Sequence, residues 1–217
     1  MIESGGQLLK IYSSSYSFKI TKAMRFFNFL FTLLLFCTQL SAQEYTIDPG
    51  HTSIQFSVER FGTVQVNGRF NDFSGTVQYD STLQKIQSAD ISIDVKSIDT
   101  GHKVRDGHLK SEIWLDAEKY PEIQFQTTEV IQSDTGMIAV GSLTIHGTTK
   151  PIQIPFERIG PLVDPTKTKA IGISGAITIN RQDYGIQFSK VFNDGILFIG
   201  NDVHININAL AIQRRQK

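Results

Sequence analysis

From residue 44 onward, apolar and polar side chains alternate along most of the chain, and this pattern limits most strongly what the sequence can fold into. In the last run, Val203, Ile205 and Ile207 alternate with polar residues. A period of two places successive side chains on opposite faces of a β-strand, so each run predicts a strand with one apolar face. Similar runs occur at residues 54–59, 64–67, 70–79, 90–96, 123–125, 143–145, 152–156 and 171–179.

Turn-forming residues separate these runs. They are Asp134-Thr-Gly136, His146-Gly147, the stretch from Pro161 to Pro165, and Asn193-Asp-Gly195. Short strands at this spacing predict an all-β fold, either an antiparallel sandwich or a barrel. No internal repeat or linker interrupts the pattern, so we expect a single domain.

One segment, residues 102–117, departs from the alternation. Val104, His108, Leu109, Ile113 and Trp114 recur there at steps of about three and four residues. This spacing predicts a short amphipathic helix or an irregular turn. A single excursion of this kind among many strands suggests a lid or plug over one end of a barrel.

The region before the strands has the pattern of a secretory leader. Met24 and Arg25 precede an apolar run from Phe26 to Cys37, and Leu40-Ser-Ala42 matches a small-residue cleavage site. We therefore predict a signal peptide at residues 24–42, an upstream extension outside the natural product at residues 1–23, and a mature domain at residues 43–217. The apolar run is shorter than the roughly 20 residues of a membrane span, so we expect no transmembrane segment in the mature protein. The predicted location is the periplasm or the exterior.

Charge and cysteine content exclude several classes. Residues 43–217 carry 17 basic and 20 acidic side chains and no cysteine. A mildly acidic surface is a poor match for phosphates, so we expect no nucleic-acid partner. Without cysteine, the domain needs no disulfides and must be stabilised by its core.

The densest polar cluster contains His102, Arg105, Asp106 and His108. Two histidines six residues apart lie on different faces of a helix, so we predict neither a metal site nor a cofactor. We expect Arg105 and Asp106 to make hydrogen bonds that anchor the helix. A hydrolase or isomerase is the alternative, and it would pair His102 or His108 with Asp106 or Asp99. The sequence contains neither a Gly-x-Ser-x-Gly nucleophile motif nor a phosphate-binding loop.

The apolar face of the sheet has two interpretations in a closed barrel. Inward side chains of an eight-stranded barrel either fill the interior or leave room for one small ligand. Alternation alone is compatible with both. If the apolar face pointed outward instead, the chain would be an outer-membrane barrel, but its single Trp and its short runs disfavour that alternative.

Several motifs resemble the YceI-like family, and they occur in order over residues 44–212. They are Tyr45-Thr-Ile-Asp-Pro-Gly-His-Thr-Ser53, Gly68-Arg-Phe-Asn-Asp-Phe-Ser-Gly75, Ser97-Ile-Asp-Thr100, Arg105-Asp-Gly-His-Leu-Lys-Ser111, Tyr120-Pro121, Gly141-Ser-Leu-Thr-Ile-His-Gly-Thr-Thr-Lys-Pro151 and Val203-His-Ile-Asn-Ile207. The chain departs from the family at Glu59-Arg-Phe-Gly62, where members often have His-Leu-Gly or His-Phe-Gly. A role of that histidine therefore does not carry over.

The resemblance implies an eight-stranded antiparallel lipocalin-like barrel, exported from the cytoplasm, with a hydrophobic tunnel for a polyisoprenoid, a quinone or a fatty-acyl amphiphile. It implies a binding protein for storage, transport or stress protection rather than an enzyme, and it is compatible with a homodimer. In the family's register, we expect the following residues to line the tunnel: Phe56, Val58, Phe70, Phe73, Ile91, Ile93, Trp114, Phe125, Leu143, Ile173 and Ile205.

Overall fold

The computed structural model describes residues 42–133 and 136–213. The predicted upstream extension and all but the last residue of the predicted signal peptide lie outside the described residues. The Asp134-Thr-Gly136 turn is described only at Gly136.

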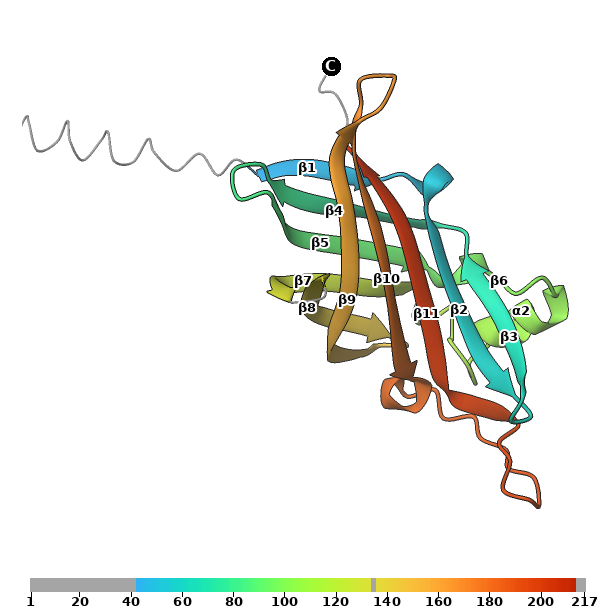
Figure 1. The fold of residues 1–217 in the computed structure, drawn as a ribbon. Helices are drawn as coiled ribbons and strands as arrows, with labels where there is room; N and C mark the ends of the chain where they lie inside the picture. The colour runs from blue at the N-terminus through green and yellow to red at the C-terminus, as the bar shows by residue number, and fades with distance from the viewer. Residues whose placement is uncertain (1–41, 134–135, 214–217) are drawn as a thin grey trace, which may run out of the picture. The chain divides into compact units, whose positions relative to one another are not determined.

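The described residues form eleven antiparallel strands in one sheet (Figure 1). The strands are β1 (Ala42–Ile47), β2 (Ser53–Arg60), β3 (Val64–Phe70), β4 (Phe73–Asp80), β5 (Lys85–Asp94), β6 (Ile98–Asp99), β7 (Glu122–Ser133), β8 (Gly136–Ile145), β9 (Thr148–Val163), β10 (Lys169–Asn180) and β11 (Ile199–Ile212).

Eight of these strands close into a barrel. The order β1-β4-β5-β7-β8-β9-β10-β11 returns to β1, because Thr46 and Ile47 pair with Ile212 and Ala211. Strands β2, β3 and β6 continue the sheet from the other half of β11. Figure 1 shows two sets of strands that cross each other: one set is β1, β4, β5, β7 and β8, and the other is β9, β10, β11, β2 and β3. The prediction of an all-β, eight-stranded antiparallel barrel with one short helix is confirmed.

A short break separates β1 from β2. The 3₁₀ turn η1 (Pro49–His51) is capped by Asp48, whose carboxylate accepts hydrogen bonds from the Gly50 amide at 3.0 Å and pairs with His51 Nδ1 at 2.7 Å. These contacts lower the pKa of the Asp48 carboxyl, the hydrogen bond from His51 contributing most. Because of this break, β1 pairs with Ala211 and Ile212 at the end of β11, and β2 pairs with the preceding part of the same strand.

The α-helix of the described region is α2 (Lys103–Lys110), which is shorter than the predicted segment 102–117. The remaining residues of that segment form turns. None of the eight helical residues is buried, and Val104 is 61% exposed. Of the expected apolar face, Trp114 packs against a buried cluster that includes Tyr184, whereas Val104 and Ile113 are exposed.

A second correction concerns the predicted loop from Pro161 to Pro165. Strand β9 continues through Val163, which pairs with Lys169 of β10, and the turn begins at Asp164. Pro161 does not end the strand, because it lies in the bulge where the β9–β10 register shifts between Ile159 and Leu162, and a proline at a bulge removes no regular ladder hydrogen bond.

Two clusters of buried side chains stabilise the barrel. One includes Tyr45, Val77, Ile171 and Ala211, which come from β1, β4, β10 and β11. The other joins Val95, Ile123, Leu143, Tyr184 and further residues from strands and connections. Many other inward side chains are only half-buried, which is the first sign that the middle of the barrel is hollow.

Candidate functional site

The barrel encloses an apolar cavity of about 780 Å³. Val203, Ile205, Ile207 and Ala209 of β11 all line it, in strict alternation with exposed polar residues. A well-packed interior leaves few voids larger than a water molecule, so a space of this size is not a packing defect, and its volume lies within the range of small-molecule pockets.

All eleven residues that the sequence predicted as tunnel lining lie on the wall of this cavity. Phe73 and Leu143 are buried, at 5% and 7% exposure, and the other nine are half-buried. The structure therefore brings the whole predicted set together. Contact with a ligand remains a prediction for each of them.

The wall includes a place where a glycine makes room for a ring. Gly68 of β3 pairs with Phe56 of β2, and the Phe56 ring lies over it. A Cβ atom at Gly68 would lie 2.3 Å from Cζ of Phe56. The same ring packs against Phe70 with centroids 5.7 Å apart. Any other residue at position 68 would therefore require the Phe56 ring to move.

The cavity reaches the surface beside α2. His102, Val104 and His108 line the cavity and are also exposed, so the helix borders an opening. We call this opening the mouth. It explains why the apolar residues of α2 are not buried: they face the cavity opening instead of a core.

Five aromatic side chains form a rim that adjoins the mouth at Trp114, because the segment of Trp114 is hydrogen-bonded to the end of α2 (Leu115 N to the Leu109 carbonyl oxygen, 3.1 Å). The rim is made of Phe61, Trp114, Phe188, Phe192 and Phe198, of which Trp114 and Phe198 also line the cavity. The Trp114 ring packs against Phe188 at 4.9 Å, and Phe188 lies 6.4 Å from Phe198. Phe198 in turn contacts Phe61 at 5.1 Å and Phe192 at 6.2 Å. This rim connects the β2–β3 turn, the segment after α2 and the loop before β11.

Arg181 is a buried cation at one end of the rim. Its side chain is 4% exposed, and its guanidinium lies 5.7 Å from the Trp114 ring. It donates hydrogen bonds to the carbonyl oxygens of Ile186 at 2.7 Å, Gly200 at 3.0 Å and Ile199 at 3.4 Å, and to Asn201 Oδ1 at 2.9 Å. Burial lowers the pKa of the Arg181 guanidinium.

Arg60 is a second cation, at the other end of the rim. Its guanidinium carbon lies 4.7 Å from the Phe61 ring and 4.9 Å from the Phe198 ring. Its Nε is buried and has no hydrogen-bond partner. Both Arg60 and Arg181 line the cavity.

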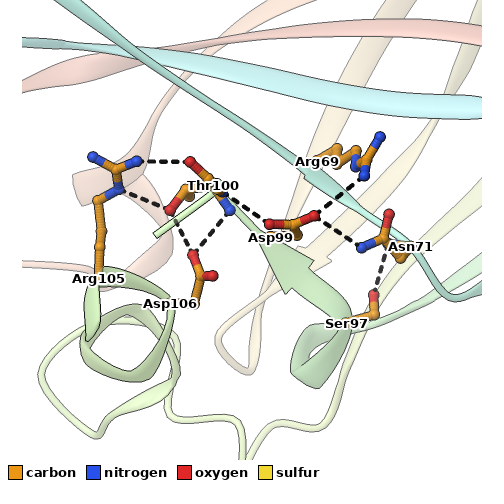
Figure 2. A network of polar contacts seen from close by, with 8 residues as sticks. Arg69, Asn71, Ser97, Asp99, Thr100, Arg105 and Asp106 are labelled. Carbon is orange, nitrogen blue, oxygen red and sulfur yellow. Dashed lines mark hydrogen bonds and ion pairs between the residues drawn. The ribbon is translucent and has the colours of Figure 1, made fainter. Parts of the chain in front are cut away.

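A hydrogen-bond network holds α2 in place (Figure 2). Arg105 donates to Oγ1 and to the carbonyl oxygen of Thr100, both at 2.7 Å, and the Asp106 carboxylate accepts from the Thr100 amide at 2.9 Å and from its hydroxyl. Thr100 directly follows β6, which pairs with β3. The expected hydrogen bonds of Arg105 and Asp106 are present, and their partner is Thr100, the residue after β6.

The acid–base pair of the enzyme alternative is not assembled. Asp99 accepts hydrogen bonds from Gly101 N at 2.8 Å, Arg69 at 3.3 Å and Asn71 at 3.4 Å, and these contacts lower the pKa of its carboxyl, the Gly101 amide contributing most. His102 caps α2 by accepting from the Arg105 amide at 3.3 Å. Within residues 42–133 and 136–213, neither His102 nor His108 is bonded to a carboxylate.

Within the same described ranges, no three His, Cys, Asp or Glu side chains gather as a metal site would require. Nor does any helix in the described part of the chain have the length and apolar character needed to cross a membrane.

The sequence prediction missed Arg60, Arg181 and Phe198 as lining residues. The signal for the two arginines was present. Arg60 continues the inward parity of Ile54, Phe56 and Val58, and Arg181 continues that of Ile177 and Ile179. Phe198 precedes its strand, in a loop without periodicity, so alternation gave no indication of it.

Comparisons with known proteins agree with this architecture. Residues 45–211 match the model of the YceI-like domain. A UPF0312 protein of Vibrio cholerae is 39% identical over 150 residues, which is 68% of this chain and 79% of that protein. A UPF0312 protein of Shewanella denitrificans is 34% identical over 157 residues, 71% of this chain and 82% of that protein.

Solved structures share the fold. Burkholderia cenocepacia BcnA superposes with a TM-score of 0.65 at 21% identity, covering 76% of this chain and 98% of that one. A polyisoprenoid binding domain from Saccharophagus degradans superposes with a TM-score of 0.58 at 17% identity, covering 81% and 100%. The family match spans nearly all the described residues and agrees with the barrel, so the chain belongs to the YceI-like family.

Proposed function

We propose that the barrel binds the apolar chain of an amphiphile, a polyisoprenoid, a quinone or a fatty-acyl compound, and shields it from water for storage, transport or stress protection. The observation that carries this proposal is the open apolar cavity, lined by the eleven residues predicted from the sequence. The structural neighbour from Saccharophagus degradans, which is described as a polyisoprenoid binding domain, supports the same ligand class.

The energetics favour a chain over a compact polar ligand. Each CH₂ group moved from water into an apolar site contributes about 0.8 kcal/mol. A long chain therefore gains substantial affinity from wall contacts alone. Length and shape then limit which chains fit the cavity.

The direct test is extraction of the protein, purified from its native host without detergent, into organic solvent, followed by mass spectrometry. We expect an apolar chain in the extract. A variant that fills the cavity provides the comparison: Ile205→Trp adds bulk to an inward position of β11, and the extract of this variant should contain at least about tenfold less chain, because overpacking removes the space.

The matched control for this experiment is Asn206→Trp, which places the same side chain on the outer face of the same strand. It should retain the bound chain. Equal recovery of an apolar compound from Ile205→Trp and from the unmodified protein would contradict binding inside the barrel.

We propose further that the protein acts outside the cytoplasm, after removal of a leader that ends near Ala42. The apolar run from Phe26 to Cys37 and the small residues before Gln43 support this. N-terminal sequencing of the protein from its host should give a start near Gln43. A mature product that still carried Ile2 to Ala23 would show that the proposed leader and start are wrong.

A further inference from the structure

The lining of the cavity has an unbalanced charge. Its charged residues are Arg60, Arg105 and Arg181, with His102 and His108 beside them, and it contains no Asp or Glu. The salt bridges among the described residues join other groups, so none of the three arginines has a carboxylate partner there. This holds although the domain as a whole is mildly acidic.

Arg181 has the largest desolvation cost of these cations, because its side chain is the most deeply buried. It is held by three carbonyl oxygens and one amide oxygen, which satisfy its donors but do not neutralise its charge. A buried charge without a counter-ion is unfavourable, and an approaching anion relieves that penalty.

Arg60 supplies the accessible contact. It is half-buried, it lines the cavity, and its buried Nε has no partner. The Phe61 and Phe198 rings on which it lies restrict its movement. A guanidinium held in this way is prepared for a charge-assisted hydrogen bond to a carboxylate or phosphate oxygen.

The aromatic rim joins the two cations. The contacts run from Arg60 through Phe198, Phe188 and Trp114 to Arg181. A ligand whose chain occupies the apolar cavity and whose head group lies at the rim would have that head group beside both cations.

We propose that the mouth binds an anionic head group, a carboxylate or a phosphate, with Arg60 as the contacting residue and Arg181 as the buried supporting charge. This inference rests on the proposed function, since it concerns the head group of the same amphiphile. It assigns the mouth a selectivity that the apolar wall cannot provide.

The test compares ligands that share a chain and differ in the head group. Delipidated protein is titrated with oleic acid, oleyl alcohol and oleylamine, and separately with farnesyl phosphate and farnesol, all below their aggregation limits. The chain has a single tryptophan, Trp114, which lies in the rim, so its fluorescence reports occupancy. We expect each anion to bind about tenfold more tightly than its alcohol, the scale of one charge-assisted hydrogen bond, and the amine to bind most weakly.

Arg60→Gln should reduce this preference to below about threefold, whereas Arg60→Lys should keep most of it. Arg158→Gln is the matched control. Arg158 also has a buried Nε without a partner and lies against a ring, that of Tyr79 at 5.4 Å, but it does not line the cavity. Its replacement should leave the preference unchanged.

The outcomes separate the two proposals. Equal affinity for acid and alcohol, or a preference that survives Arg60→Gln, would overturn the head-group inference and leave chain binding intact. If neither the anions nor the alcohols bind, the proposed function fails as well. A preference confined to the carboxylate or to the phosphate would identify which of the two anions the mouth accepts.

Discussion

At the scale of single residues, Tyr45 combines complete burial with an unsatisfied polar atom. Its side chain is 0% exposed, its ring packs edge-on against Tyr79 at 6.1 Å, and its hydroxyl has no hydrogen-bond partner. An unpaired buried hydroxyl costs about 1–3 kcal/mol, whereas the ring contributes to the core. The two parts of this side chain therefore act on stability in opposite directions.

Replacing Tyr45 with Phe should raise the free energy of unfolding by about 1 kcal/mol, because it removes the unpaired hydroxyl and keeps the ring. Urea unfolding followed by circular dichroism measures the change. Tyr45→Ala is the contrasting variant and should cost about 3–5 kcal/mol, since it leaves a cavity. A loss of stability in Tyr45→Phe would mean that the hydroxyl has a partner after all.

The same variant has a pH signature. Burial raises the pKa of Tyr45 above its ordinary value, and burial likewise raises the pKa of Tyr184. The folded state then binds more protons than the unfolded chain once the pH exceeds about 10, so stability falls as the pH rises further. Tyr45→Phe should show a shallower alkaline loss than the unmodified protein, with no difference in slope between pH 7 and 9.

At the scale of elements, α2 is held by its polar network rather than by buried apolar contacts. Its first turn is tied to Thr100 through Arg105 and Asp106, while none of its residues is buried. An element with few buried contacts opens locally at low free energy. We therefore expect α2 to open locally before the barrel unfolds.

Asp106→Ala should therefore loosen α2 without unfolding the barrel. We expect the free energy of unfolding to fall by about 1–2 kcal/mol, because the Thr100 bonds to the carboxylate are lost. Amide hydrogen exchange over residues 103–115 should be faster than in the unmodified protein, whereas exchange over β10 should change less. Asp90→Ala, an exposed position on β5, is the control and should change stability by less than about 0.5 kcal/mol. Exchange that remained as slow as in the unmodified protein would show that the apolar contacts of α2 suffice to hold it.

The elements also show what the sequence could and could not predict. The strands and the eleven inward residues follow from alternation together with the family register, because strand geometry ties parity to face. Strand β1 has only Tyr45 and Ile47 as inward apolar residues before Pro49, too few to form a pattern. Arg60 and Arg181 were missed because alternation was read from apolar residues alone, and a cation at an inward position interrupts such a pattern.

At the scale of the whole molecule, the decisive property was whether the inward side chains fill the barrel. Alternation decides which face of a strand is apolar, but it contains no information about the volume between opposite walls. That volume depends on how eight strands close and on which inward positions are small, such as Gly175, Ala139 and Ala209. The cavity therefore depends on how the barrel closes, and composition alone does not predict its volume.

The way in which β11 pairs has a consequence for the newly made protein. This strand, the last one described, pairs with β10, β2 and β1. While β11 is still inside the ribosome, β10 and β1 are not joined, and the barrel of the nascent chain is open. Pairings between such distant segments are also slow to form. The barrel therefore closes only after β11 has left the ribosome, and we expect an apolar ligand to bind after the translation of that strand.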